Sequence, residues 1–156
     1  MNNENGHVSK GFTPEAVTEL KDNEIFVFGS NRLGKHIGGA ARIAKDKFGA
    51  KEGIFEGITG RTYAIPTLDE NFQKVRESEL LFSLRKFLSV VVEDKENVYI
   101  LTKIGCGIAG WNVRQVAYIF AFALKIVTKG AEIPDNLIIP QEFHPMEVEH
   151  FRKKKI

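Results

Sequence analysis

The chain has 156 residues, of which 43% are hydrophobic and 27% are charged, a balance typical of one soluble globular domain. Its formal net charge of +2 is too small to indicate a nucleic-acid partner, and no apolar stretch reaches the ~20 residues of a transmembrane helix. The single cysteine excludes an intramolecular disulfide and a cysteine zinc cluster. Residues 1–10 lack the apolar core of a signal peptide, so we expect a cytoplasmic protein that does not contact a membrane.

The predicted organisation is a single domain between two short tails. Residues 1–12 are polar and are predicted to form a disordered N-terminal tail. Residues 151–156 are rich in lysine and are predicted to form a basic, solvated C-terminal tail. No linker composition divides residues 13–150, which we therefore expect to fold as one domain.

Helix and strand signals alternate along this domain. Thr13 and Pro14 are typical of a helix start, and that first helix is predicted to end near residues 21–23. Apolar or small side chains at helical spacing predict three further helices, at residues 38–48, 77–92 and 113–128. Short apolar runs predict strands at residues 25–28, 62–65, 98–102 and 137–139, with Pro66 and Pro140 ending two of them.

The alternation predicts a three-layer α/β fold, in which a mixed, mainly parallel sheet is flanked by helices. The carboxyl ends of parallel strands share one edge, and open α/β sheets bind ligands at that edge. Three loops are expected to meet there, at residues 29–41, 66–69 and 104–111. Gly38 and Gly107 should therefore lie at the same edge of the sheet.

Two glycine-rich loops nearly match known phosphate-binding motifs. Residues 29–36 have the glycines and the lysine of G-x-x-x-x-G-K-[ST], but His36 replaces the hydroxyl that holds magnesium. Residues 105–110 match G-x-G-x-x-G, yet no acidic residue ends the following strand. The sequence thus favours neither a nucleoside triphosphatase nor a dinucleotide-dependent oxidoreductase. A glycine loop that opens a helix still favours binding of a phosphate, because the backbone N–H groups are accessible there.

Four segments together resemble the macrodomain superfamily, over roughly residues 24–143. They are F-G-S-N at residues 28–31, G-G-A-A at 38–41, Y-A-I-P-T at 63–67 and I-G-C-G-I-A-G at 104–110. Their order and spacing look most like those of small macro-like proteins of bacteria and their phages. The resemblance implies a macro-like fold that binds ADP-ribose or a related nucleotide derivative. Residues 1–23 hold no counterpart of the early Asp by which macrodomains recognise adenine.

The motifs and the resemblance together give the candidate site residues. Asn31 and Asp69 are the candidate catalytic residues, Asn31 at the distal ribose and Asp69 orienting a water or binding a ribose hydroxyl. In the alternative reading, each of these side chains only forms a turn. The candidate ligand-binding residues are Gly29, Ser30, Asn31, Gly34, Lys35, Gly38, Gly39, Ala40, Thr67, Ile104, Gly105, Cys106, Gly107, Ile108, Ala109, Gly110 and Trp111.

Several reactive or aromatic side chains have two interpretations. Cys106 is predicted to be a small phosphate-loop residue rather than a nucleophile, since no partner base can be assigned to it. Arg32 and Lys35 either contact phosphate or are solvated charges. Trp111 either stacks on the ligand or belongs to the core or its rim. We expect His36 to be structural or solvent-facing, and we expect neither a metal site nor a cofactor.

Three functions follow from this sequence and remain open at this stage. The first is an ADP-ribosyl hydrolase that cleaves a bond at the distal ribose, which needs little beyond orientation of substrate and water. The second is a non-catalytic reader of a nucleotide derivative. The third is a structural or assembly protein whose glycine loops are only turns. In the first two the partner is a small molecule such as ADP-ribose, and the sequence predicts no oligomeric state.

Overall fold

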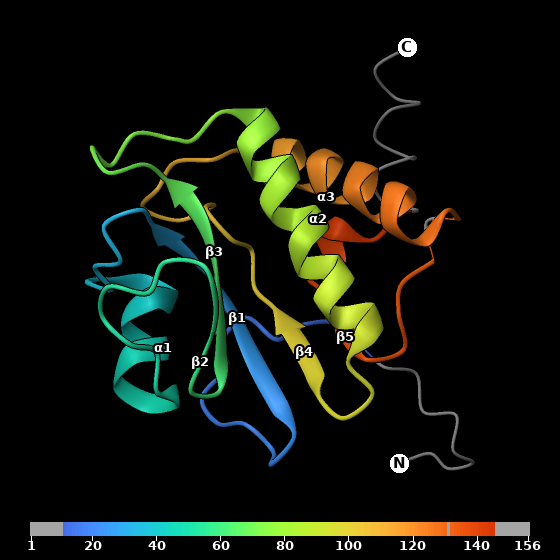
Figure 1. The fold of residues 1–156 in the computed structure, drawn as a ribbon, viewed down its shortest axis with the longest axis horizontal. Coiled ribbons are helices and arrows are strands. Elements are labelled where there is room, and N and C mark those ends of the chain that lie inside the picture. The colour runs from blue at the N-terminus through green and yellow to red at the C-terminus, as the bar shows by residue number, and fades with distance from the viewer. Residues whose placement is uncertain (1–10, 131, 146–156) are drawn as a thin grey trace.

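The computed structural model describes residues 11–130 and 132–145 of the chain. The sheet follows the order β2-β3-β1-β4-β5, and Figure 1 shows its strands with the helices packed around them. The strands are β1 (Glu24–Asn31), β2 (Gly57–Thr59), β3 (Thr62–Leu68), β4 (Val98–Leu101) and β5 (Leu137–Ile138). The helices are α1 (Gly39–Phe48), α2 (Glu77–Glu93) and α3 (Val113–Thr128), followed by the short 3-10 helix η1 (Gln141–Phe143).

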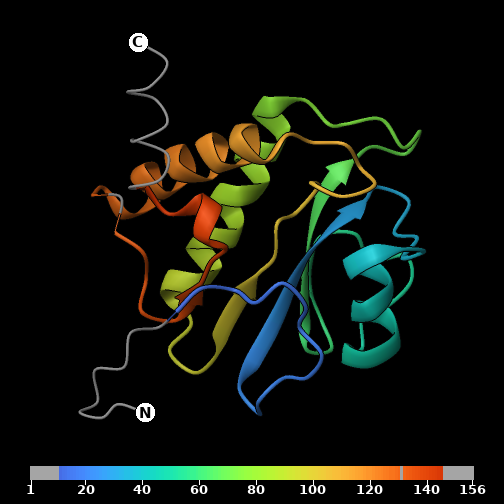
Figure 2. The ribbon, with the colours of Figure 1, turned by 180° about the vertical axis from the view of Figure 1, so that it is seen from behind.

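The sheet lies between two helical layers, which confirms the predicted three-layer α/β fold. Strand β1 alternates strictly: Ile25 and Val27 face the cluster formed with α2 and α3, whereas Phe26 and Phe28 face α1. Figures 1 and 2 show α1 on one side of the sheet and the α2–α3 pair on the other. Because β1 is buried on both faces, its sequence is a continuous apolar run instead of an alternating one.

The strand pairing is mixed and mainly parallel, as predicted. β1 runs parallel to both β3 and β4, and β4 runs parallel to β5. The short edge strand β2 is antiparallel to β3. The carboxyl ends of β1, β3 and β4 therefore point to the same edge, which is the upper edge in Figure 1.

Two sequence predictions were wrong. Residues 13–23 form no helix, and instead Thr13 anchors this segment to the sheet, its N–H donating to the carbonyl of Ile139 at 2.8 Å. Its hydroxyl also donates to the carbonyl of Leu101 at 2.6 Å. Strand β3 does not end at Pro66 but continues to Leu68, with a shift of register between Ser30 and Asn31 on the neighbouring strand. A proline cannot donate to the ladder, so it is accommodated where the pairing is irregular.

Strand β2 was not predicted, because a three-residue strand that begins with Gly57 carries too little local pattern to identify an edge strand. The predicted tails at residues 1–12 and 151–156 fall on segments that lie, except for residues 11 and 12, outside the described residues. In the part of the chain that is described, no helix is long and apolar enough to cross a membrane.

Candidate functional site

The three predicted loops meet at the carboxyl edge of the sheet. A Cβ atom added to Gly29 at the end of β1 would lie 3.0 Å from the backbone N of Gly105 and 3.3 Å from the Thr67 side chain. The Thr67 hydroxyl also donates to the carbonyl of Ser30 at 3.3 Å, which ties β3 to β1. A Cβ on Gly38 would lie 3.6 Å from Cδ1 of Ile108. The prediction that the two glycine loops share one edge is thus confirmed.

Asn31 shapes the first loop. Its side-chain Oδ1 accepts hydrogen bonds from the backbone N–H groups of Leu33 and Lys35, both at 3.2 Å. Its Nδ2 donates to the Lys35 carbonyl at 2.8 Å. Asn31 is buried, so this amide acts as a local brace that curls residues 31–35. These contacts match the turn-forming alternative, and the catalytic role of Asn31 remains a prediction.

Gly34 holds the same loop against a neighbouring one. Its φ is +70°, and a Cβ there would lie only 2.5–2.8 Å from the backbone atoms of Gly53. The N–H of Gly53 donates to the carbonyl of Gly34 at 2.9 Å. Gly34 is buried at this contact, so the structure accounts for it by packing, not by the approach of a ligand.

No side chain caps the start of helix α1 among the described residues. Its N-cap is Gly38, which supplies no side-chain hydrogen bond, and its first turn contains no acidic residue. Within the described residues, the backbone N–H groups of Gly39, Ala40 and Ala41 have no acceptor. Such a helix start presents unpaired donors and the positive end of the helix dipole, which favours an anion.

The second glycine loop leaves three of its amides without an acceptor in the described residues. Its internal bonds run from Cys106 N–H to the Lys103 carbonyl, from Gly110 N–H to Gly107 and from Trp111 N–H to Gly105. The N–H groups of Gly107, Ile108 and Ala109 have no acceptor in the ranges that the structure describes. A Cβ on Gly107 would meet nothing within 4 Å, so packing inside the protein does not require glycine at this position.

Trp111 lies beneath this loop and belongs to the core. It is only 4% exposed, and its Nε1 donates to the carbonyl of Thr67 at 2.9 Å. Gly105 sits directly against it with a φ of +74°, and a Cβ there would be 2.8 Å from Trp111 Cδ1. Of the two sequence interpretations of Trp111, the structure therefore supports the core one: the ring supports the loop, and little of its surface is left to stack on a ligand.

Cys106 is a poor nucleophile in this setting. Burial raises the pKa of its thiol to about 11, and the nearby Lys103 charge offsets only part of that rise. Its Sγ donates to the carbonyl of Ile104 at 3.4 Å. The thiol is therefore protonated at neutral pH, which agrees with its predicted role as a small loop residue.

Asp69 stands at the start of the turn that follows β3. Its Oδ1 accepts hydrogen bonds from the backbone N–H groups of Asn71 at 2.8 Å and Gln73 at 3.0 Å. This is the contact pattern of an aspartate that forms a turn. The predicted catalytic role of Asp69 stays a prediction, with one carboxylate oxygen already engaged.

The basic side chains near the edge differ in their availability. Arg32 is ion-paired with Glu79 at 3.2 Å, whereas Lys35 is exposed and forms no ion pair among the described residues. His36 is fully buried, as a structural residue would be, with its Nε2 3.0 Å from the Lys51 carbonyl. A carbonyl only accepts, so the proton of a neutral His36 is on Nε2.

Sequence reasoning missed one cation at this edge. The ammonium of Lys74 lies 5.5 Å from the centre of the Trp111 ring. The only sequence signal for it would have been the hairpin-like turn that returns the chain from Leu68 to Lys74, and this pairing is not visible in a local pattern.

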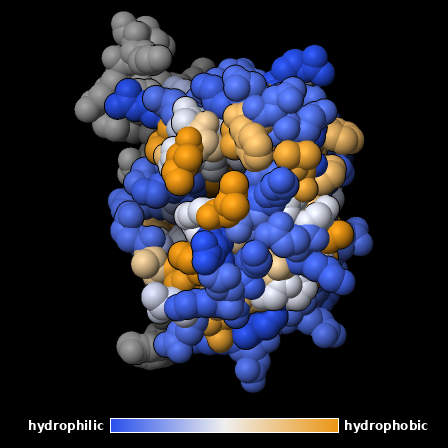
Figure 3. Space-filling model, turned by 90° about the vertical axis from the view of Figure 1, so that its left-hand side faces the viewer, coloured by the Kyte–Doolittle hydropathy of each residue, from blue (hydrophilic) through white to orange (hydrophobic). Residues whose placement is uncertain are grey.

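The rim of the site is apolar and exposed. Ile108 is 92% exposed, and the side chains of Leu33, Ile37 and Phe72 are also exposed on the loops of this edge. Figure 3 shows the side of the molecule that lies to the left in Figure 1, with apolar side chains concentrated in its upper half. Of these side chains, Ile37 and Ile108 lie next to the unpaired amides, and exposed apolar side chains beside free donors are typical of a binding surface.

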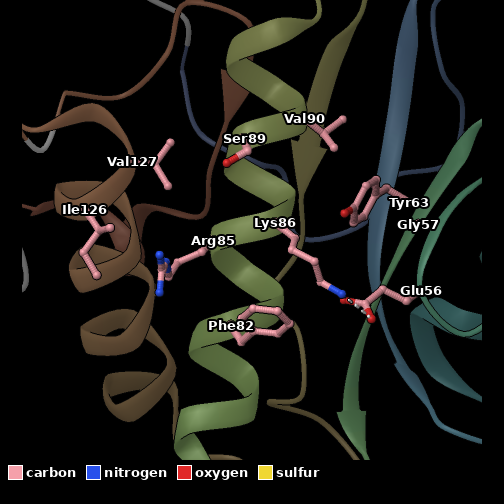
Figure 4. A pocket seen from close by; sticks show the side chains of 10 residues that line it. All are labelled: Glu56, Gly57, Tyr63, Phe82, Arg85, Lys86, Ser89, Val90, Ile126 and Val127. Carbon is pink, nitrogen blue, oxygen red and sulfur yellow. Dashed lines mark ion pairs between the residues drawn. The ribbon is translucent and has the colours of Figure 1, made fainter.

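A separate groove of about 700 Å³ lies along α2, away from the glycine loops. Figure 4 shows Lys86 pointing toward Glu56 on one side of α2 and Arg85 pointing toward α3 on the other. Lys86 and Glu56 form an ion pair at 3.1 Å. The groove is open to solvent, and it shares no residue with the sequence-predicted site. In the described residues no cluster of His, Cys, Asp and Glu is arranged to hold a metal ion.

Comparison with known proteins supports the fold alone. No family model matches the chain and no curated protein is similar to it. The chain is similar in structure to a solved protein of unknown function from Bacteroides thetaiotaomicron, with a TM-score of 0.52 and 12% sequence identity. The similarity covers 86% of this chain and 90% of that one, so it extends over nearly the whole α/β arrangement.

Proposed function

We propose that the protein binds ADP-ribose or a related nucleotide derivative at the carboxyl edge of its sheet. The observation that carries the proposal is that two groups of backbone N–H without acceptors lie close together. They are at residues 107–109 and at the start of α1. The two groups lie close together, since a Cβ atom added to Gly38 would be 3.6 Å from Cδ1 of Ile108. A diphosphate fits this chemistry, because it offers acceptor oxygens to both groups at once.

The electrostatics of the edge favour an anion over a neutral ligand. The first turn of α1 has no carboxylate that would occupy its N–H groups, and the 104–110 loop holds no charged side chain at all. An anion at a helix start gains from both the free donors and the helix dipole. The exposed apolar side chains of Ile37 and Ile108 can cover the base or sugar of a nucleotide.

The side chains of the site favour a binding module over a hydrolase. Asn31 uses its amide to brace the loop, and Asp69 uses one oxygen to cap a turn. The raised pKa of Cys106 removes the one candidate nucleophile. A reader needs only the amides and the rim, whereas a hydrolase needs a group free to orient water.

Isothermal titration with ADP-ribose, NAD and nucleoside phosphates tests the proposal. We expect the wild type to bind ADP-ribose, and Gly107→Glu to abolish binding because its carboxylate occupies and repels the anion site. The matched control is Gly130→Glu, which makes the same change just past the end of α3, where an added Cβ would lie 4.0 Å from the Thr128 carbonyl oxygen, an ordinary contact. Both variants should unfold at nearly the wild-type temperature.

Two outcomes would contradict the proposal. A wild type that binds none of these ligands would favour the structural role for the glycine loops. A Gly107→Glu variant that binds as tightly as the Gly130→Glu control would move the ligand away from the 104–110 loop.

A further inference from the structure

The proposed anion site holds few free cations of its own. The 104–110 loop is uncharged, and Lys103 just before it forms ion pairs with two carboxylates. Arg32 on the opposite loop is held by Glu79 at 3.2 Å. Only Lys35 among the basic residues singled out from the sequence is exposed without an ion pair in the described structure. A diphosphate diester carries one negative charge on each phosphate, so Lys35 alone leaves one charge without a partner.

Lys74 is placed to supply the second cation. It is exposed, and no carboxylate of the described residues lies within ion-pair distance of its ammonium. Its ammonium lies 5.5 Å from the centre of the Trp111 ring. The same indole contacts Gly105, where an added Cβ would be 2.8 Å from Trp111 Cδ1. The Lys74 ammonium thus lies beside the same indole that packs against the 104–110 loop.

The backbone of this region fixes the base of the Lys74 side chain. Lys74 pairs with Leu68 in an antiparallel bridge, and the N–H of Val75 next to it donates to the carbonyl of Thr67 at 3.1 Å. Thr67 also accepts the Trp111 Nε1 proton. The end of β3 therefore holds both the backbone around Lys74, through Leu68 and Thr67, and the Trp111 indole, through Thr67.

We propose that Lys74 is a ligand-contacting cation of this site, which, with Lys35, neutralises the diphosphate of the bound nucleotide. This assignment rests on the proposed function. A lysine suits the role because its ammonium is a compact charge on a flexible stem and can follow a phosphate. The competing explanation is that the Lys74 ammonium only makes a cation–π contact with Trp111 and touches no ligand.

Two variants test whether the charge of Lys74 contacts the ligand. Lys74→Met keeps an unbranched apolar side chain and removes the charge beside Trp111, and Lys74→Arg keeps the charge. The control Lys47→Met removes a lysine from the last turn of α1, at the opposite end of that helix from Gly38. The probes are ADP-ribose and inorganic pyrophosphate, titrated by calorimetry at low and at high salt.

We expect Lys74→Met to weaken ADP-ribose binding about tenfold and to reduce its dependence on salt, because a charge-assisted contact is lost. Lys74→Arg should stay within about threefold of the wild type, since its guanidinium also pairs with phosphate. Lys47→Met should bind as the wild type does. Lys74→Met should unfold at nearly the wild-type temperature, because a cation–π contact from an exposed lysine adds little to stability.

The outcomes distinguish this inference from the function on which it rests. A wild type that binds neither probe refutes the proposed function and this assignment with it. A wild type that binds, together with a Lys74→Met variant of equal affinity and equal salt dependence, refutes the role of Lys74 alone. Weakening of both probes in Lys74→Met supports it, and tighter binding of ADP-ribose than of pyrophosphate identifies the ligand as a nucleotide rather than a free diphosphate.

Discussion

Replacing Gly34 by alanine should destabilise the loop that carries Asn31 and Lys35. A Cβ at Gly34 would lie 2.5 Å from the carbonyl carbon of Gly53 and 2.6 Å from its Cα, where no side chain can rotate away. Relieving such an overlap costs about 1–3 kcal/mol. The φ of +70° adds about 1–2 kcal/mol for a residue with a Cβ. The sum, about 2–5 kcal/mol, is a large part of the ~5–15 kcal/mol that stabilises a typical domain.

The neighbouring Gly53 provides a matched control. Its φ is +91°, but a Cβ there would meet nothing within 4 Å. Gly53→Ala should therefore cost only the backbone part, about 1–2 kcal/mol. The difference between the two variants isolates the overlap between the loops.

Urea denaturation of the wild type, Gly34→Ala and Gly53→Ala measures these free energies of unfolding. We expect Gly34→Ala to be the less stable variant by at least about 1 kcal/mol. Equal destabilisation of the two variants would refute the reasoning, because it would mean that the contact between the loops places no steric limit on residue 34.

Two further predictions concern single titratable groups. Cys106→Ser should bind ADP-ribose as the wild type does, and lost binding would contradict the role of Cys106 as a small loop residue. The wild-type thiol should react slowly with a thiol reagent at neutral pH, and rapid labelling would contradict its raised pKa of about 11. Hydrogen bonds from Tyr99 and then Asn97 lower the pKa of Asp94 from 3.8 to about 2, so Asp94 stabilises the fold above its ordinary pKa and loses this effect as the pH falls toward 2. Urea midpoints measured across this range should fall less steeply in Asp94→Asn, and parallel curves would argue against the effect.

The layers of the fold could be predicted from the sequence because their signals are local. The apolar run at residues 25–28 and the helical spacing at residues 113–128 each identify an element without knowledge of its neighbours. The cap signal at Thr13 is equally local, but it was overridden, because Val17 and Leu20 pack on the α1 side of the sheet as part of an irregular segment. Strand β2 exists only through its pairing with β3, so no local pattern could predict it.

The meeting of the candidate loops at one edge was predictable, while the contacts of their side chains were less so. Parallel pairing brings the loops after β1, β3 and β4 to one edge, and the sequence contains enough to infer that. The burial of Trp111 depends on the carbonyl of Thr67, which is distant in sequence. Lys74 reaches the edge only because the chain turns back after Leu68. Such tertiary contacts decide whether a residue binds or only packs, and residue types alone do not contain them.

The most direct test of the account is an amide chemical-shift titration of the ¹⁵N-labelled protein with ADP-ribose. We predict that the largest shifts fall on the N–H groups of residues 39–41 and 107–109, whose donors lack acceptors in the described structure. Lys74 and its neighbours should shift as well. An absence of shifts at saturating ligand, or shifts confined to the groove along α2 near Phe82 and Lys86, would contradict the claim that the glycine loops form the binding site.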